Sequence, residues 1–148
     1  MSAMSPPIVV GFDPSGADDA PVHFGIAAAR FTGAPLIVAT VYGGKRPLSR
    51  LADGEFREEL SAEAHGALER LRERLAGEDV PCEVRLVEAA SAARGLHVAL
   101  ETEGAVLGVV GATARGAVAR TVLGSTAERV IHGAPCSITV VPHGFSED

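Results

Sequence analysis

Five short apolar runs alternate along the chain with longer segments whose apolar residues recur at helical spacing. Short runs that are apolar throughout are typical of strands buried on both faces, whereas the longer segments are typical of amphipathic helices. The predicted strands are residues 8–12, 35–41, 83–87, 105–110 and 137–141. The predicted helices are residues 18–33, 56–75, 91–104 and 125–133. This alternation predicts an α/β fold, in which a parallel sheet carries helices on both faces.

Two rules of chain topology give the expected order of the strands. Crossover connections are right-handed, and a doubly wound sheet starts in its middle and grows outward in both directions. We therefore expect a single doubly wound five-stranded parallel sheet in the order 3-2-1-4-5. Residues 83–87 alternate polar and apolar, as an edge strand with one exposed face does. The first and fourth strands then meet at the switch point, where Asp13 and Gly111 stand at the carboxyl ends.

The length and charge of the chain limit the class of protein. We expect a single domain over residues 1–148, with flexible ends at residues 1–6 and 143–148, because 148 residues can bury one sizeable core. A net charge of −6 argues against general nucleic-acid binding, which requires a basic footprint. No basic stretch precedes an apolar one at the N-terminus, and every apolar run is shorter than the ~20 residues of a membrane span. We expect a cytoplasmic protein that binds neither nucleic acid nor membranes.

Residue types at the helix faces and ends give local predictions. In the first helix, one face at helical spacing carries Phe24, Ala27, Ala28 and Phe31, and we expect this face to be buried. Ser91 suits the N-cap of the third helix. Ser125, with Glu128 three residues later, forms a capping-box pattern for the fourth helix. Cys82 and Cys136 precede the two expected edge strands, so we expect free thiols that are too far apart to bridge.

The stretch from Gly111 to Ser125 combines glycines, small residues and two arginines between a predicted strand and a predicted helix. Such a loop exposes backbone N–H groups at the positive end of a helix dipole, which suits a phosphate. Glycines in a strand-to-helix turn can also serve positive φ or close packing alone. The loop is neither of the commoner phosphate loops, because the sequence lacks Gly-Lys-Ser/Thr and no Gly-x-Gly-x-x-Gly follows the first strand.

Four segments together resemble the universal stress protein family. The loop pattern Gly-x2-Ala-x9-Gly-Ser, which starts at Gly111, is similar to that family's Gly-x2-Gly-x9-Gly-Ser/Thr nucleotide loop. Residues 9–15 look like its Val-Gly-x-Asp-x-Ser start, residues 107–111 like its Ile-Val-Val-Gly strand, and residues 134–141 like its Ala-Pro-Cys-Pro-Val-x-Val-Val close. The matches follow the family's order and spacing and extend over nearly the whole chain.

The resemblance implies that the chain binds ATP, with Mg²⁺ left open as a companion ion. It implies that Asp13 lies on the ribose or adenine side, that the backbone of Val41 contacts adenine, and that the glycine loop holds the phosphates. The implied binding residues are Asp13, Ser15, Val41, Val110, Gly111, Ala114, Arg115, Gly116, Gly124, Ser125 and Thr126. From the residues alone, other roles stay open: Asp13 can shape a turn, the two valines can be core residues, and Ser125 can be only a helix cap.

The chain departs from the family pattern at two places. Ala114 replaces the second glycine of the loop, which adds a methyl group and, if the position needs positive φ, a strain of roughly 1–2 kcal/mol. Gly104 and Ala105 stand where the family has an Asp at the start of the fourth strand, which we interpret as structural variation.

Three functions remain open. The first is an ATP-binding regulatory module of the stress response with little or no hydrolysis. The second is a dimeric protein-interaction module, with an unknown protein partner, that has lost its nucleotide through Ala114. An ATPase or phosphotransferase is the least supported, because we identify no catalytic group beyond the single carboxylate of Asp13. An apolar edge strand would be protected by antiparallel pairing in a homodimer, as the resemblance also implies. That strand comprises Ser137, Ile138, Thr139, Val140 and Val141.

Overall fold

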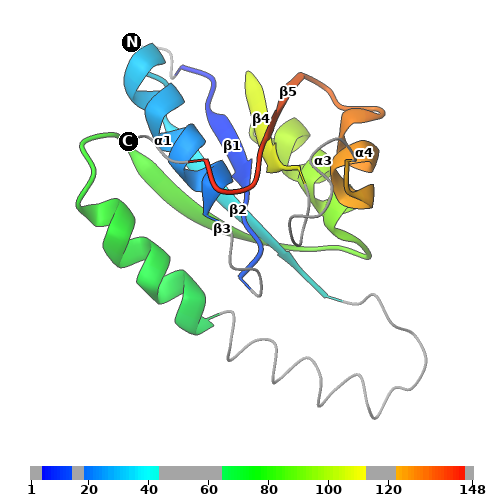
Figure 1. Cartoon of the computed structure of the whole chain (residues 1–148), viewed down its shortest axis with the longest axis horizontal. Coiled ribbons are helices and arrows are strands. Elements are labelled where there is room, and N and C mark those ends of the chain that lie inside the picture. Colours follow the sequence, from blue (N-terminus) through cyan, green and yellow to red (C-terminus); the bar gives the residue numbers. More distant parts are fainter. Residues whose placement is uncertain (1–4, 15–18, 44–64, 113–122, 146–148) are drawn as a thin grey trace.

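The computed structural model describes residues 5–14, 19–43, 65–112 and 123–145. The strands are β1 (Ile8–Gly11), β2 (Leu36–Tyr42), β3 (Cys82–Glu88), β4 (Leu107–Gly111) and β5 (Ser137–Val141). They form one sheet in the order β3-β2-β1-β4-β5, and all neighbours are parallel (Figure 1). The predicted α/β class, the parallel sheet and the 3-2-1-4-5 order are confirmed, and β3 is an edge strand as expected.

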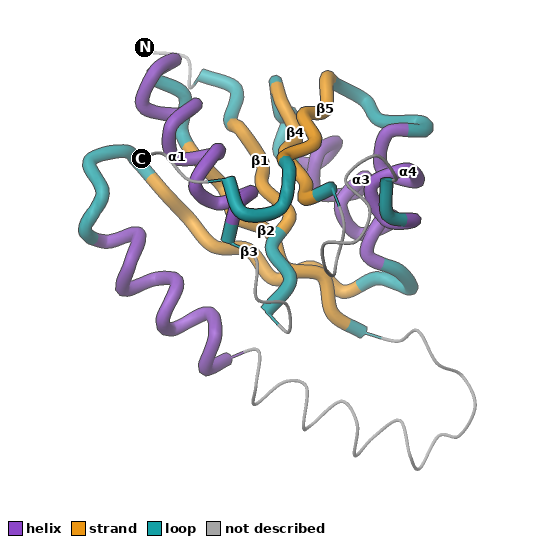
Figure 2. The backbone as a smooth tube through the Cα atoms, in the orientation of Figure 1, coloured by secondary structure: helices purple, strands orange, loops and turns teal. Residues whose placement is uncertain are grey.

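Helices cover both faces of this sheet (Figure 2). One face carries α1 (Ala20–Thr32) and a helix whose described part is residues 65–76, which we call the 65–76 helix. The other face carries α3 (Ala92–Thr102) and α4 (Ser125–Ile131). The predicted start of the 65–76 helix at residue 56 lies outside the described residues. No helix in the described part of the chain is long and apolar enough to cross a membrane.

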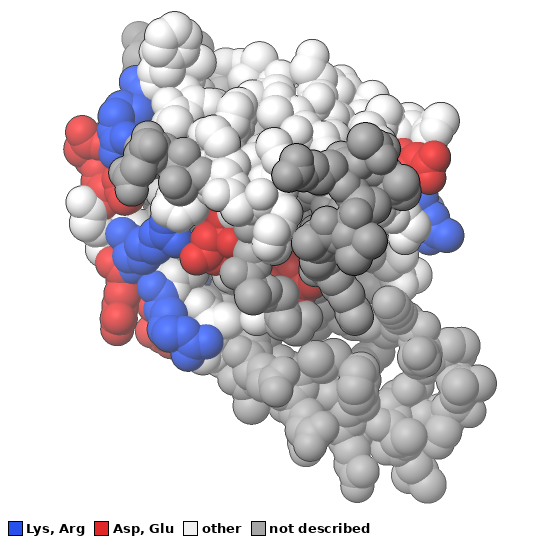
Figure 3. All heavy atoms as spheres, in the orientation of Figure 1, with Lys and Arg blue, Asp and Glu red and all other residues white. Residues whose placement is uncertain are grey.

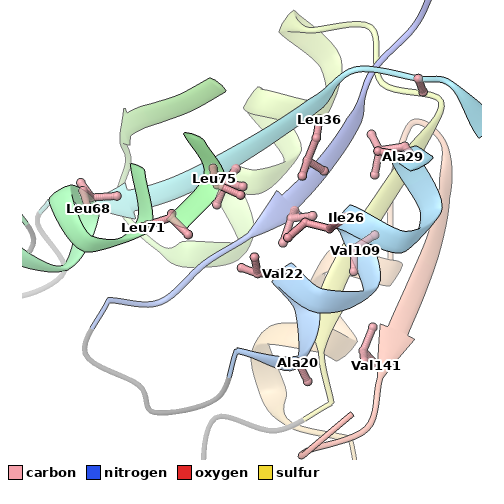
Figure 4. Packing of buried hydrophobic residues seen from close by; sticks show 14 residues of the cluster. Ala20, Val22, Ile26, Ala29, Leu36, Leu68, Leu71, Leu75, Val109 and Val141 are labelled. Atoms are coloured by element: carbon pink, nitrogen blue, oxygen red, sulfur yellow. The ribbon is translucent and has the colours of Figure 1, made fainter. Parts of the chain in front are cut away.

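The core is divided by the sheet into two layers. Val10 and Leu36 belong to the layer under α1, whereas Val9 and Ile37 belong to the layer under α3 and α4. This division follows from the alternation of side chains along a strand. The 65–76 helix contributes a stripe of leucines to the first layer (Figure 4), namely Leu68, Leu71 and Leu75.

The predicted buried face of α1 is wrong. The residues of α1 that are buried are Ala20, Pro21, Val22, Gly25, Ile26 and Ala29. Phe31 is 91% exposed, and Phe24 is only partly buried. Gly25 explains the choice of face, because a Cβ there would lie 2.4 Å from Cγ2 of Val10. Without a side chain at this position, α1 approaches β1 closely along the face that contains Gly25.

The helix caps are partly as expected. The Ser91 hydroxyl caps α3 by accepting a hydrogen bond from the Arg94 backbone N–H at 3.2 Å, which confirms the prediction. In α4, however, Gly124 is the N-cap and Ser125 is already the first helical residue, so the predicted Ser125 cap is wrong. The reason is that the Gly124 backbone is extended and its carbonyl accepts the first helical hydrogen bond, from Glu128 N.

The start of β4 and the segment after β5 complete the description of the fold. β4 begins at Leu107 rather than Ala105, because the Ala105 N–H still donates to the carbonyl of Leu100 at the end of α3. After β5, the Phe145 ring packs against Phe24 of α1, with the ring centroids 5.9 Å apart.

The two cysteines lie at opposite edges of the sheet. Cys82 is the first residue of β3, and Cys136 directly precedes β5. Both are free thiols, as predicted. Burial raises the pKa of both thiols above the usual value. The thiolate is the reactive form of cysteine, so neither side chain is prepared as a nucleophile.

Candidate functional site

The sheet opens at the carboxyl ends of the neighbouring strands β1 and β4. Pairing of β1 with β4 ends at Val10 and Val109. Pairing of β1 with β2 continues to Gly11, and pairing of β4 with β5 continues to Gly111. The chain segments that leave β1 and β4 therefore diverge, each following its outer neighbour. This is the crevice of a doubly wound sheet, at the switch point where ligands bind in such folds.

Hydrogen bonds fix both sides of the crevice. On the β1 side, the Phe12 N–H donates to Ala39 O at 2.9 Å, and the Thr40 hydroxyl donates to Phe12 O at 3.1 Å. Thr40 is completely buried, and its hydroxyl supports the backbone immediately before Asp13. On the β4 side, the Ala112 N–H donates to the carbonyl of Val141 in β5 at 2.9 Å.

The start of α4 is attached directly to the β4 side. The Gly124 N–H donates to the carbonyl of Ala112 at 2.7 Å, so the two ends of the glycine loop are joined by a hydrogen bond. Ser125 and Thr126, the first two residues of α4, are both exposed. The first N–H groups of a helix have no partner within that helix. Backbone donors of α4 and the carboxyl end of β4 therefore face the same side of the fold.

The structure brings together part of the predicted site. Asp13 is exposed after β1, and Val110, Gly111, Gly124, Ser125 and Thr126 lie at the end of β4 or the start of α4. Val41 lies near the end of β2, the next strand of the sheet. Ser15, Ala114, Arg115 and Gly116 lie outside the described residues.

The side chains of the two predicted valines serve the core. A Cβ at Gly95 of α3 would lie 2.5 Å from Cγ2 of Val41, which shows how tightly Val41 is packed under α3. Val110 is buried in the layer under α3 and α4. Val110 therefore offers only its backbone to a ligand, whereas the side chain of Val41 is packed on α3 but only partly buried. Thr40 was not predicted; a polar residue inside the otherwise apolar run 35–41 is the signal that marks it.

The described residues form an open hollow of about 460 Å³ elsewhere in the molecule. It lies between the carboxyl end of the 65–76 helix and β3, and Leu75, Val80, Cys82 and Val84 are among the residues that line it. This hollow is at the β3 edge of the sheet, away from the crevice between β1 and β4. The hollow therefore does not mark the candidate site, which is identified by the divergence of β1 and β4 and by the backbone N–H donors beside it.

Several charged side chains form ion pairs on the surface. Arg30 contacts Glu78 at 2.7 Å and Asp79 at 3.2 Å, and Arg74 contacts Asp19 at 3.3 Å. On the face drawn in Figure 3, basic side chains are accompanied by acidic ones. Exposed pairs of this kind contribute roughly 0–1 kcal/mol each. Among the residues the structure describes, no group of three or more His, Cys, Asp or Glu side chains is arranged to hold a metal ion.

Comparisons with known proteins agree on one family. A model of the universal stress protein family matches residues 4–142. A universal stress protein of Mycobacterium tuberculosis (strain H37Rv) is 33% identical over an alignment of 144 positions, which covers 93% of this chain and 49% of the relative. The chain thus spans about half the length of the curated relatives it matches.

Solved structures show the same fold. UspA from Lactobacillus plantarum superimposes with a TM-score of 0.76 at 24% identity, covering 95% of this chain and 99% of that one. A universal stress protein in complex with cAMP gives a TM-score of 0.64 at 24% identity, with 95% and 99% coverage. The Archaeoglobus fulgidus protein in complex with dAMP gives 0.60 at 20% identity, with 94% and 99% coverage.

Proposed function

Because this chain belongs to the universal stress protein family, we propose that it is an ATP-binding regulatory module of the stress response, with little or no hydrolysis. The observation that carries the proposal is the crevice between β1 and β4, whose β4 side is joined to the start of α4 by the bond from Gly124 to Ala112. Two solved relatives hold adenine nucleotides, cAMP and dAMP.

The described residues fit a nucleotide by the kind of atoms that they offer. Exposed Ser125 and Thr126 begin α4, where backbone donors and the helix dipole favour an anion. Asp13 stands across the crevice at the end of β1, where its carboxylate suits a ribose or an accompanying Mg²⁺. Gly111 and Gly124 leave room for phosphates. Ser15, Ala114, Arg115 and Gly116 complete the proposed site, with Val41 and Val110 contributing backbone atoms.

The proposal is tested first by what the purified protein carries. Protein purified without added nucleotide is denatured, and the released small molecules are separated by ion-exchange chromatography. Stoichiometric adenine nucleotide is the expected result. A protein that releases none, and that also fails to bind added ATP in calorimetry, is not a nucleotide-binding module.

We predict that hydrolysis of ATP is negligible. The proposed site supplies backbone donors and positive charge that hold a triphosphate, but we identify no group that would activate or orient the attacking water. Turnover should therefore fall far below the ~1 s⁻¹ at the low end of typical enzymes. Phosphate release is measured for the parent and for Asp13→Ala. Sustained release near that rate that disappears in Asp13→Ala contradicts the prediction.

We also propose a homodimer through β5. This strand has five residues and is an edge of the described sheet. Ile138 and Val140 face the layer under α3 and α4, and Val141 faces the layer under α1. Because the Val141 carbonyl points toward β4, the backbone groups of Ile138 and Val140 point outward. Antiparallel pairing with a second β5 would satisfy these groups and cover an apolar edge.

The homodimer has a simple test. Val140→Pro removes an outward N–H without removing a bond to β4, so at low micromolar concentration the variant should sediment as a monomer while the parent sediments as a dimer. Val140→Thr keeps the N–H and the β-branched shape, and serves as the matched control. A parent that is monomeric at micromolar concentration by light scattering rules out the β5 pairing.

A further inference from the structure

The outer edge of β3 is a second surface on which the sheet could be extended. β3 is seven residues long, Cys82–Glu88, and in the described sheet it pairs only with β2. Pro81 O accepts from Leu36 N at 2.8 Å, and Ala89 N donates to Tyr42 O at 3.0 Å. Backbone groups of odd-numbered residues therefore point toward β2, because successive residues of a strand point to opposite sides. Those of the even-numbered residues point outward.

The side chains of β3 also fall into two sets. Cys82 and Val84 pack in the layer of the 65–76 helix. Leu86 shares their face by alternation and is 45% exposed. On the opposite face, Arg85 pairs with Glu83 and donates to Glu103 of the α3 end at 3.1 Å. One face of the edge is thus apolar, and the other carries opposite charges two residues apart.

We propose that β3 is a self-association surface, at which two copies of this chain pair their β3 strands antiparallel about a two-fold axis at Val84. The charges select this register, because Glu83 of each copy then stands directly opposite Arg85 of the other. Opposite charges on directly facing residues stabilise antiparallel pairs, whereas like charges destabilise them. A two-fold axis at Val84 makes two such favourable pairs.

The backbone and the apolar face agree with the same register. Val84 faces Val84, and Cys82 faces Leu86 of the second copy, as hydrogen-bonded pairs whose outward N–H and carbonyl groups match. Glu83 and Arg85 form the non-hydrogen-bonded pairs, in which facing side chains lie closest. Leu86 of the second copy is then placed at Cys82, beside the hollow of about 460 Å³ that Cys82 and Val84 line. Its exposed side chain would be buried there.

This contact is independent of the proposed β5 dimer and of the nucleotide crevice. β3 and β5 are the two opposite edges of the sheet. Two different two-fold contacts on opposite edges extend an assembly into rows and do not close it. The parent should therefore form species larger than a dimer as its concentration rises. Substitutions in β3 should remove only this growth and should leave ATP binding unchanged.

Charge reversal tests the pairing. Glu83→Arg places two arginines opposite two arginines, and Arg85→Glu places two glutamates opposite two glutamates. Each variant alone should self-associate through β3 at least about tenfold more weakly than the parent, measured by sedimentation. An equimolar mixture should associate again, because every facing pair across the mixed contact is then an arginine and a glutamate. A mixture that associates no better than its components overturns the proposal, provided thermal melting shows both variants folded.

A disulfide tests the register directly. In a Cys136→Ser background, Leu86→Cys should give a covalent dimer on oxidation with diamide, linked between residues 82 and 86 of different copies. Facing Cα atoms in such a pair are ~5.5 Å apart, within the range of a disulfide. Within one copy the same residues are about 13 Å apart at ~3.3 Å per residue, so they cannot bridge.

Glu88→Cys in the same background is the matched control. In the proposed register Cys82 faces residue 86 of the other copy, and residue 88 lies two positions further along, so it should not cross-link to Cys82. Peptide mapping identifies the bridge. Cross-linking of Glu88→Cys that equals that of Leu86→Cys, or none in either, overturns the proposed register.

Discussion

Gly124→Val is expected to abolish ATP binding, while Ala114→Gly is expected to strengthen it. Gly124 is the N-cap of α4, with φ −68° and ψ 161°, which a valine adopts without strain. Its N–H donates to Ala112 at 2.7 Å, so it lies where the start of α4 joins the end of β4. A valine side chain there would occupy the space of the proposed phosphates. The loss should therefore come from filled volume in a protein that stays folded.

The effect of Ala114→Gly follows from the kind of donor that holds the phosphates. Position 114 lies outside the described residues, and alanine retains its backbone N–H. The methyl group therefore costs room and, if φ is positive there, roughly 1–2 kcal/mol of strain. Removing it should tighten binding roughly five- to thirtyfold.

Calorimetry with the parent and both variants measures these changes, and thermal melting shows whether each is folded. Gly124→Ala is the graded control, because it adds one methyl group and should weaken binding less than valine. If the parent and Ala114→Gly both give no heat with millimolar ATP, the loop no longer binds nucleotide. The function that the result then supports is that of a dimeric protein-interaction module without nucleotide.

The fold was predictable because the spacing of apolar residues along the sequence distinguishes its strands from its helices. Short runs that are mainly apolar are typical of strands in a sheet covered on both faces, and the alternating run around Glu83 and Arg85 indicates an edge strand. The neighbouring strands β1 and β4 then place Asp13 and Gly111 at one crevice. These inferences need no knowledge of individual contacts.

The details that were not predicted depend on contacts. Two stripes of α1 have helical spacing, and the larger Phe24 and Phe31 favoured the wrong one; the missing side chain of Gly25 lets the other stripe approach Val10. At α4, a serine followed by a glutamate resembles a capping box, yet the extended backbone of Gly124 takes the cap position. Residue type alone does not decide between such neighbours.

In the candidate site too, residue type alone does not show which contacts the side chains make. The sequence marks Asp13 and Gly111, but it does not show that the buried Thr40 hydroxyl bonds to the Phe12 carbonyl beside Asp13. Nor does it show that Val41 is packed against Gly95, which covers part of the Val41 side chain. The packing of side chains therefore limits which atoms can contact a ligand, and the sequence motif alone does not show this limit.

Gly95→Ala is expected to destabilise the protein and loosen the site, whereas Gly66→Ala is expected to stabilise it. Both glycines lie in helices, so each alanine gains roughly 0.5–1 kcal/mol of helix propensity. At Gly95 the new Cβ would lie 2.5 Å from Cγ2 and 2.6 Å from Cγ1 of Val41. At Gly66 its nearest neighbour among the described residues is the flexible end of Arg70, at 3.6 Å. The pair therefore isolates the cost of the clash.

Overpacking of this kind costs about 1–3 kcal/mol, which exceeds the helix gain, so urea unfolding should show a lower free energy for Gly95→Ala and a higher one for Gly66→Ala. To relieve the clash, α3 must move away from β2 at Val41, whose backbone is proposed to contact adenine. ATP affinity should then fall in Gly95→Ala and remain unchanged in Gly66→Ala. Equal stability in the two variants would mean that α3 moves without cost. A loss of stability with unchanged affinity would place the adenine away from Val41.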